Sequence, residues 1–293
     1  MSVSRKHFVR ITTWDDIYKM SGYTDSLDPK KEKLKHVINK YELPNKGRCG
    51  LSNCRTPHFN GYIVETETGK LTNLGHICGK NHFGLNFTSL KNKLDKEVEY
   101  INKVEIIKVA KLGIENKRIE ISSIESYWNE IEDVYRTIKI EGLNELHSRL
   151  DLMSNSKDPT ISIQHNASKS ERDLEEVRTG RRVEGKLYIS EKIGKLNGLN
   201  YIKNRIRIEA MIFNNRLILK DLEKFDENKK SLKNINIMIK ENERLEDSIR
   251  EAHSIIADGF KLFSTDNMKQ FTPLINSKRH RKLRRFLNCC FET

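Results

Sequence analysis

The sequence predicts a mostly α-helical fold with a small α+β domain at its N-terminus, then long helical hairpins and an extended C-terminal arm. Charged residues make up 32% of the chain and hydrophobic residues 36%, with only 5 prolines, a composition typical of helix-rich proteins. After residue 87, apolar residues recur mainly at helical spacing. The predicted segments are an α+β domain over 1–87, a helical hairpin over 88–153, a linker with short strands or turns over 154–200, a second helical hairpin over 201–264, and the arm over 265–293.

A strand and two helices are predicted before residue 45. Residues 7–13 resemble a strand, and Thr13 is a suitable N-cap for a short helix over 13–20 with acidic residues near its positive end. The proline at position 29 begins the second helix, because proline is favoured at the first helical position. This helix ends at the proline at position 44, and its apolar face consists of Leu34, Val37, Ile38 and Tyr41.

Cysteines and histidines gather at the two ends of a predicted β-hairpin. The hairpin has a strand over 62–65, a turn over 67–69 and a return strand over 70–73. Cys49 and Cys54 precede it, and Cys78 follows it between His76 and His82. Zinc binds four Cys or His ligands in a tetrahedron, and such a site can fold a segment too small to have its own core. The sequence therefore predicts one zinc ion as cofactor of a zinc-binding N-terminal domain.

Three cysteines leave the fourth zinc ligand to a histidine. His82 is favoured because it lies four residues after Cys78, so that both would share one face of a helix. His76, two residues before Cys78, is the second choice, and His58 also competes. The alternatives are three buried reduced cysteines without metal, or an open catalytic zinc with a bound water. No glutamate lies beside a ligand as a hydrolytic or deaminase site requires, which favours a structural zinc.

Apolar stripes with alternating steps of three and four residues mark the predicted helices. The first hairpin carries Ile124, Trp128, Ile131, Tyr135 and Ile138, and the second carries Ile235, Met238, Asn242, Leu245, Ile249, Ala252 and Ile256. Such coiled-coil stripes form either the core of one chain, which is their commoner use, or a seam between copies. Two long seams are more than one thin hairpin needs, so we expect a homo-oligomer.

The C-terminal arm combines a basic block with apolar residues. The basic residues are Lys278, Arg279, Arg281, Lys282, Arg284 and Arg285, and the apolar ones are Phe286, Leu287 and Phe291. A solvated tail would need only the charges, whereas the apolar residues prefer burial against this subunit, a second copy or a foreign partner. Charges steer a partner and apolar anchors hold it, so the arm is the predicted partner-binding site.

The charge balance and the missing motifs limit the classes of function. Lys and Arg number 54 against 41 Asp and Glu, a formal net charge of +13, which attracts nucleic acid, acidic proteins or anionic lipid without choosing among them. No apolar run of eighteen residues and no signal peptide are found, so we expect no membrane partner and a location in a cytoplasm. No nucleophile elbow, HExxH pair, Walker motifs or kinase set occurs, so we expect a protein that is not an enzyme.

The segments CGLSNC, PHFNGYIV and TNLGHICGKNHFG resemble an N-terminal module of phage and prophage proteins. In size, helix content and the basic-aromatic arm, the chain is also similar to the Gabija anti-defence protein family, phage inhibitors that enclose a bacterial nuclease complex. This resemblance implies a non-enzymatic oligomer that binds the host defence nuclease complex in the host cell cytoplasm and blocks its DNA binding and cleavage. The alternative is a zinc-containing nucleic-acid-binding protein of phage or mobile-element origin, which would use its positive charge and its tail on phosphates.

Overall fold

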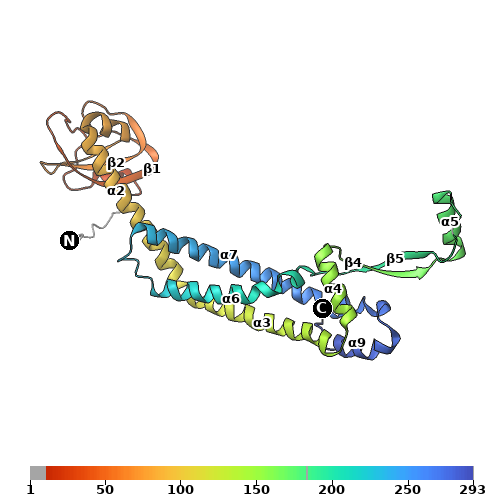
Figure 1. The fold of residues 1–293 in the computed structure, drawn as a ribbon. Coiled ribbons are helices and arrows are strands. Elements are labelled where there is room, and N and C mark those ends of the chain that lie inside the picture. The colour runs from red at the N-terminus through yellow and green to blue at the C-terminus, as the bar shows by residue number, and fades with distance from the viewer. Residues whose placement is uncertain (1–10, 183, 293) are drawn as a thin grey trace. The chain divides into compact units, whose positions relative to one another are not determined.

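The computed structural model describes residues 11–182 and 184–292. The chain divides into two units, Met1–Glu105 and Ile106–Thr293. The first contains a three-stranded sheet, and the second contains long helices and a two-stranded ribbon (Figure 1). This architecture confirms the predicted mostly α-helical fold with a small α+β region at the N-terminus. In the described ranges, no helix combines the length and the apolar character that a membrane span requires.

The short N-terminal helix forms as the sequence predicts. α1 spans Trp14–Tyr18, and Thr13 caps it by accepting a hydrogen bond from the Asp16 backbone N–H at 3.3 Å. Asp16 returns the interaction by accepting from the Thr13 backbone N–H at 2.9 Å, which completes a capping box. The strand predicted over 7–13 lies in part outside the described residues, and residues 11–13 are not in a strand.

The sheet of the first unit has the order β1–β2–β3 with antiparallel neighbours. β1 spans Leu34–Arg48, β2 spans Pro57–Thr66 and β3 spans Leu71–Leu74. Gly69, with φ +84°, lies in the turn between β2 and β3, a conformation that glycine adopts readily. The predicted hairpin is thus confirmed.

The helix predicted between residues 28 and 44 is wrong, because most of this segment belongs to β1. Buried positions alternate with more exposed ones at Val37, Asn39, Tyr41 and Leu43, the period of a strand. Register shifts before residue 39 interrupt this alternation and bring apolar residues into a spacing that resembles a helix. The proline at position 44 lies within a third register shift, where a strand tolerates it.

Apolar side chains cover both faces of this sheet. Tyr62 and Val64 belong to one core cluster together with Phe87 of the following helix. Ile63, between them in sequence, belongs to a second cluster that includes Ile17 of α1. The first unit therefore has a core of its own, so its fold does not depend on a metal site alone.

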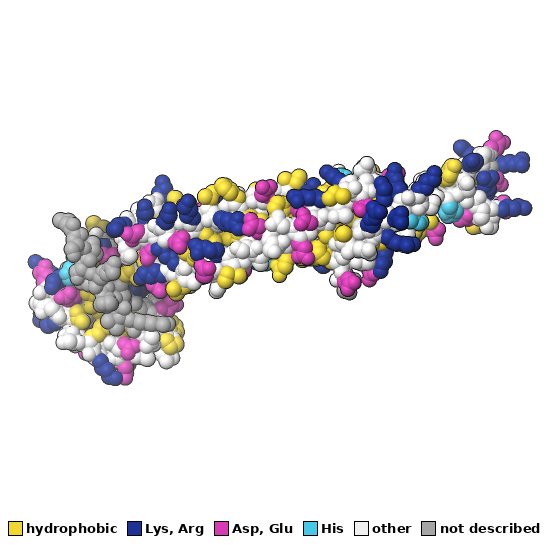
Figure 2. All heavy atoms as spheres, turned by 90° about the horizontal axis from the view of Figure 1, so that it is seen from below, with side chains coloured by type: hydrophobic (Ala, Val, Ile, Leu, Met, Phe, Trp, Pro, Cys, Tyr) yellow, Lys and Arg dark blue, Asp and Glu magenta, His cyan; other side chains and the backbone are white. Residues whose placement is uncertain are grey.

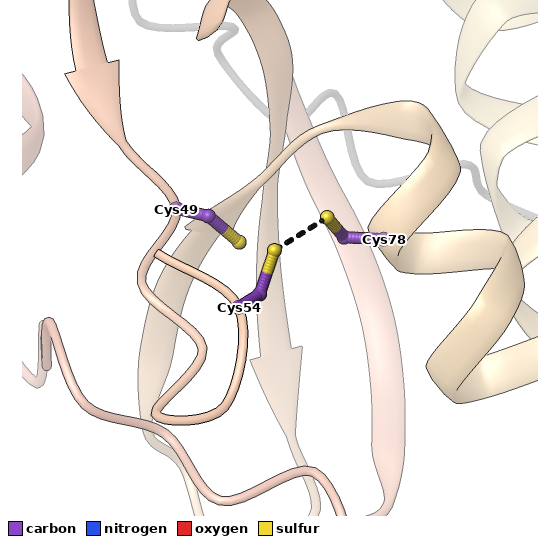
Figure 3. Close-up of side chains that lie close together, drawn as sticks. All are labelled: Cys49, Cys54 and Cys78. Carbon is purple, nitrogen blue, oxygen red and sulfur yellow. Dashed lines mark hydrogen bonds between the residues drawn. The ribbon is translucent and has the colours of Figure 1, made fainter. Parts of the chain in front are cut away.

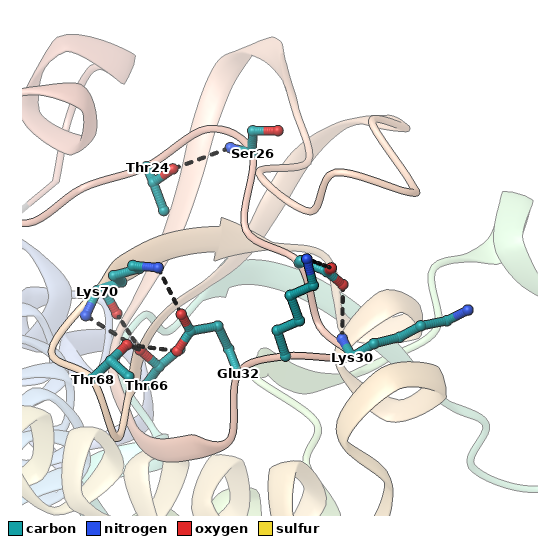
Figure 4. Close-up of polar contacts among 9 residues, drawn as sticks. Thr24, Ser26, Lys30, Glu32, Thr66, Thr68 and Lys70 are labelled. Atoms are coloured by element: carbon teal, nitrogen blue, oxygen red, sulfur yellow. Dashed lines mark hydrogen bonds and ion pairs between the residues drawn. The ribbon is translucent and has the colours of Figure 1, made fainter.

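A buried carboxylate ties the segment before β1 to the β2–β3 turn (Figure 4). Glu32 accepts hydrogen bonds from Lys70 Nζ at 2.7 Å and from Thr68 Oγ1 at 2.6 Å. The Lys70 ammonium and then the Thr68 hydroxyl lower the pKa of this carboxyl. The same segment pairs with the loop after β1, because Leu27 donates its N–H to the Gly50 carbonyl at 2.8 Å.

α2 spans His76–Leu112 and begins directly after β3. Gly84 interrupts it with a non-helical φ of 59° and ψ of −135°. Beyond this kink, the fully buried Phe87 packs against Tyr62, with ring centroids 5.7 Å apart. A Cβ on Gly79 would lie 2.4 Å from the Phe87 ring. Glycine at 79 therefore makes room for the ring that holds the first turns of α2 against the sheet.

Four long helices build the second unit: α3 (Ile114–Ile140), α4 (Asn144–Ser156), α6 (Asn200–Lys224) and α7 (Leu232–Leu262). α6 and α7 pack on each other as the predicted hairpin, and α3 packs on both of them. Most residues of the two predicted stripes are buried, and Asn242 accepts a hydrogen bond from Lys117 Nζ at 2.9 Å. The stripes are therefore the core of one chain and do not support a homo-oligomer.

The segment predicted as a linker with short strands or turns forms a two-stranded ribbon with a helix between its strands. β4 spans Thr160–Asn166, α5 spans Lys169–Thr179 and β5 spans Tyr188–Lys195. α5 lies at the end of the ribbon, away from the long helices (Figure 1), and no residue of it is buried. Its apolar side chains Leu174 and Val177 are 70% and 83% exposed.

Residues 265–292, predicted as an extended arm, instead form short helices that fold back onto the other helices of the second unit. They are α8 (Thr265–Lys269), two 3₁₀ turns (Thr272–Leu274 and Ser277–Arg279) and α9 (His280–Leu287). Phe286 is fully buried, and the Phe291 ring packs on Phe260 of α7 at a centroid distance of 4.7 Å. Of the three predicted surroundings for these residues, namely this subunit, a second copy or a foreign partner, the chain itself is the one that both rings contact.

Candidate metal centre

Three segments bring three cysteines together in the first unit (Figure 3). Cys49 follows the end of β1, Cys54 lies in the loop before β2, and Cys78 lies in the first turn of α2. Their sulfur atoms all lie within 4.8 Å of one another, and Cys54 Sγ is 3.0 Å from Cys78 Sγ. All three are free thiols. We call this group the cysteine cluster.

The loop between Cys49 and Cys54 is held by backbone contacts on both sides. Cys49 donates its N–H to the Thr56 carbonyl at 3.1 Å, and Gly50 donates to the Asn73 carbonyl at 2.8 Å. A Cβ on Gly50 would lie 2.1 Å from Thr72 Oγ1, so only glycine allows the loop to approach β3 so closely. The sheet therefore fixes where two of the three sulfurs lie.

The three thiols differ in how readily they ionise. Burial raises the pKa of Cys54, but hydrogen bonds with the Thr56 hydroxyl, 3.3 Å away, and with Cys78 outweigh it, so that the pKa falls to about 7. Burial, followed by the contact with Cys54, raises the pKa of Cys78 to about 12. Burial also raises the pKa of Cys49. One thiolate is therefore accessible near neutral pH, while a second and a third would need a cation beside them.

Among the described residues, this is the one group of three or more cysteine, histidine or acidic side chains whose ligand atoms lie close enough to hold a metal ion. Three sulfurs within one ion's reach can bind a soft metal, for which thiolate is a preferred ligand. Its position at the junction of sheet and helix suits a structural cross-link between them.

None of the three histidines predicted as ligands belongs to the cysteine cluster. His58 is occupied elsewhere: its Nε2 lies 2.5 Å from the Tyr41 hydroxyl and its Nδ1 lies 3.1 Å from the Thr56 carbonyl. Burial lowers the pKa of His58. His76 and His82 are exposed in the first turns of α2, and the His76 ring lies 6.1 Å from that of Phe87. His58 is thus a structural residue, and two histidines stay available.

A hollow of about 660 Å³ lies next to Cys49. Basic and aromatic side chains share its wall, among them Arg48, Arg55, Tyr18 and Tyr23. Arg55 is held by Asp25, whose carboxylate oxygen lies 3.5 Å from Nη2. This ion pair compensates part of the positive charge that faces the hollow.

The basic residues predicted to bind a partner lie on and before α9. Leu283 and Phe286 are buried on one side of this helix, and the arginines and lysines lie on its exposed sides. Arg279 pairs with Glu145 at 2.9 Å and Arg285 pairs with Glu141 at 3.4 Å. In the part of the chain that the structure describes, the cations that form no ion pair here are Lys278, Arg281, Lys282 and Arg284. We call the exposed basic residues of this segment, Lys278, Arg281, Lys282, Arg284 and Arg285, the α9 basic face.

The structure also contains a buried cluster of polar side chains that the sequence does not predict. Glu132 of α3, 5% exposed, accepts hydrogen bonds from Tyr201 Oη at 2.9 Å and from Arg205 Nη1 at 2.8 Å. Arg205 also lies over the Tyr135 ring, 4.3 Å from its centroid. We call Glu132, Tyr201 and Arg205 the Glu132 cluster. The one sequence signal is that Glu132 directly follows the stripe residue Ile131.

Comparisons of the chain with protein-family models, curated proteins and solved structures found no match.

Proposed function

We propose that the protein binds nucleic acid through the α9 basic face and that a zinc ion in the cysteine cluster has a structural role. The observation that carries the proposal is that α9 buries its apolar side within the chain while its cations remain exposed. Phe286 would favour a protein partner for this segment if it were exposed, but it is buried within its own chain. Exposed charge without apolar anchors suits phosphates better than it suits a protein surface.

The spacing of the sulfurs supports zinc. A Zn–S bond of about 2.3 Å in a tetrahedron places neighbouring sulfurs about 3.8 Å apart, and the three sulfurs here lie within 4.8 Å of one another. His82 is the proposed fourth ligand, because it lies one helical turn after Cys78 on the same side of α2. His76 is the alternative. The metal affinities of His82→Ala and His76→Ala decide between them, and the variant that binds metal more weakly identifies the ligand.

The arrangement of the cations supports phosphate contacts. Three of the unpaired cations, Arg281, Lys282 and Arg284, lie within four residues of one helix. Figure 2 shows Lys and Arg side chains gathered at the end of the helical unit where α4 and α9 lie. Each cation that meets a phosphate releases a counterion, so binding should weaken as salt rises.

Fluorescence anisotropy with a labelled DNA duplex at several salt concentrations tests this proposal. The variant combines Arg281→Ala, Lys282→Ala and Arg284→Ala, and we expect the salt slope to fall by about 0.9 for each phosphate that the variant no longer neutralises. The matched control removes as many positive charges from α7, through Lys240→Ala, Arg244→Ala and Arg250→Ala. A wild-type protein that does not bind DNA, or a control whose affinity falls as much, would contradict the proposal.

A second candidate function is inhibition of a host defence nuclease, as the resemblance to the Gabija anti-defence family implies. One observation favours it: α5 at the end of the ribbon exposes Leu174 and Val177, and exposed apolar residues on a projecting element suit a protein partner. On this proposal the protein is a non-enzymatic inhibitor that works in the host cytoplasm.

Cleavage of DNA by a purified Gabija complex tests this second candidate. We expect the wild-type protein to inhibit cleavage, and Leu174→Asp with Val177→Asp to relieve inhibition while DNA binding by the α9 basic face stays unchanged. Both residues are exposed, so the variant should fold. Cleavage that continues at a large excess of wild-type protein would rule this candidate out.

A further inference from the structure

α6 carries apolar side chains on two opposite sides. Its inner side includes the buried Ile208, Ile212 and Leu219. Its outer side carries Ile206, Ala210, Phe213 and Leu217, which follow one another at steps of four, three and four residues. At about 100° per residue, these four lie in a narrow sector opposite the inner side. We call them the outer stripe.

The chain leaves the outer stripe open to solvent. Ile206 is 73% exposed, Phe213 is 63% exposed and Leu217 is 43% exposed. Two ion pairs border it: Arg216 with Glu125 of α3 at 2.6 Å, and Arg207 with Glu251 of α7 at 2.9 Å. Figure 2 shows apolar side chains exposed along the helices of this unit. A helix that is apolar on opposite sides is typical of one covered on both.

We propose that the outer stripe joins two copies of this chain, with their α6 helices packed antiparallel. The stripe is symmetric about its midpoint between residues 211 and 212. Antiparallel packing therefore sets Ile206 opposite Leu217 of the second copy, and the small Ala210 opposite the large Phe213. Parallel packing in register would instead set Phe213 against Phe213 and leave Ala210 against Ala210. The alternation of large and small side chains thus favours the antiparallel arrangement.

The charges beside the outer stripe are complementary in the same arrangement. Lys203 and Asp221 lie on one flank of α6, and Glu209 and Arg216 lie on the other. Antiparallel packing brings Lys203 near Asp221 of the second copy and Glu209 near Arg216. In the described ranges Lys203, Glu209 and Asp221 form no ion pair within the chain. Charges on the flanks of a helix pair determine its orientation, so the free charges point to the same partner as the stripe.

This contact differs from the seams that the sequence predicts. The stripes around Ile131 of α3 and Leu245 of α7 are buried in the core of one chain. The outer stripe was not among the predicted seams, because on α6 the apolar residues of the core and of the stripe overlap in sequence.

Analytical ultracentrifugation over a wide range of protein concentration tests the proposal. We expect wild-type protein to reach twice the 34.3 kDa chain mass, and Phe213→Glu to remain monomeric. Ile237→Glu on α7 is the matched control, since Ile237 is also apolar and 50% exposed, and it should leave the dimer intact. Circular dichroism of each variant verifies that it folds.

Charge reversal tests the antiparallel orientation. Lys203→Glu alone and Asp221→Lys alone should each weaken the dimer about tenfold, because each variant replaces attraction with repulsion in both of the symmetry-related pairs of the dimer. The double variant should restore the wild-type dissociation constant, because each new charge meets its opposite in the second copy. A wild-type monomer at every concentration, or a dimer that Phe213→Glu does not affect, would overturn the proposal. Failure of the double variant to recover would overturn the antiparallel orientation.

Discussion

The cysteine cluster of the first unit and the Glu132 cluster of the second differ in the groups that they bring together. Three thiols meet in the first, and two of them have a raised pKa. In the second, one carboxylate meets a guanidinium and a phenol that both donate to it. Three thiols that ionise together repel one another, so they need an added cation to be stable. A carboxylate, a guanidinium and a phenol instead supply each other's hydrogen-bond partners and opposite charge.

This difference indicates that the first unit depends on a metal ion for this cross-link, whereas the second unit needs no ligand for its cluster. The Glu132 cluster sets the register among α3, α6 and the residues around them without any ligand. The cysteine cluster joins β1, the following loop and α2, and it becomes a cross-link only when it binds metal. Two tryptophans, Trp14 in the first unit and Trp128 in the second, allow each unit to be followed by itself.

Removal of metal should have the largest effect, and only on the first unit. In a Trp128→Phe background, chelation or Cys54→Ser should lower the free energy of unfolding reported by Trp14 by about 4 kcal/mol, the linkage expected when free metal exceeds its Kd a thousandfold. The core of this unit should keep it folded at low temperature. Elemental analysis should give one zinc per wild-type chain and none in Cys54→Ser.

The control for this prediction is Cys289→Ser, because Cys289 is an exposed thiol outside the cluster. It should leave metal content and both unfolding transitions unchanged. Wild-type protein that is folded and free of metal, with a Trp14 transition insensitive to chelator, would show that the three cysteines are an ordinary part of the core.

Loss of the Glu132 carboxylate should have the next largest effect, and only on the second unit. Glu132→Leu leaves the Arg205 and Tyr201 donors without their acceptor, which should cost about 3 kcal/mol. Tyr201→Phe removes a single hydrogen bond and should cost about 1 kcal/mol. Denaturant unfolding followed by Trp128 in a Trp14→Phe background measures both.

Glu125→Leu is the matched control, because Glu125 pairs with Arg216 on the exposed surface of the same helices. Such a pair is worth up to about 1 kcal/mol. If Glu132→Leu destabilised the second unit no more than this control does, the Glu132 cluster would contribute no more stability than an exposed ion pair.

The smallest effects should come from two capping carboxylates, one in each unit. Hydrogen bonds from the Thr12 backbone, and then from Thr13, lower the pKa of Asp16 to about 2. The Ser168 hydroxyl and backbone lower the pKa of Glu171 to about 2. Because both values lie below the ordinary ones, each cap stabilises its helix fully above about pH 4.5 and loses this effect as the pH falls toward 2.

NMR titration of the two carboxyl groups measures this directly. Both should titrate close to pH 2, and Thr13→Ala should raise the value of Asp16 without changing that of Glu171. Equal values near 4 for both groups would show that the capping boxes do not persist in solution.

Local chemistry lets the sequence determine several features by itself. The hairpin of β2 and β3 follows from a glycine turn between apolar strands, α1 follows from Thr13, and the hairpin of α6 and α7 follows from long repeats separated by a charged turn. The grouping of Cys49, Cys54 and Cys78 also follows, since a hairpin brings its two ends together. Each of these depends on residues close in sequence.

Only the tertiary structure decides what covers each surface. Periodicity shows that an apolar side exists but not which segment packs on it, so the sequence left open whether Phe286 is buried in its own chain, in a second copy or in a partner. The sequence did not predict β1, because its local residue pattern shows neither the strand that pairs with it nor the register shifts of that pairing. Glu132 is buried only because two donors arrive from α6. Burial depends on residues distant in sequence, and for that reason the fold, rather than any local motif, determines it.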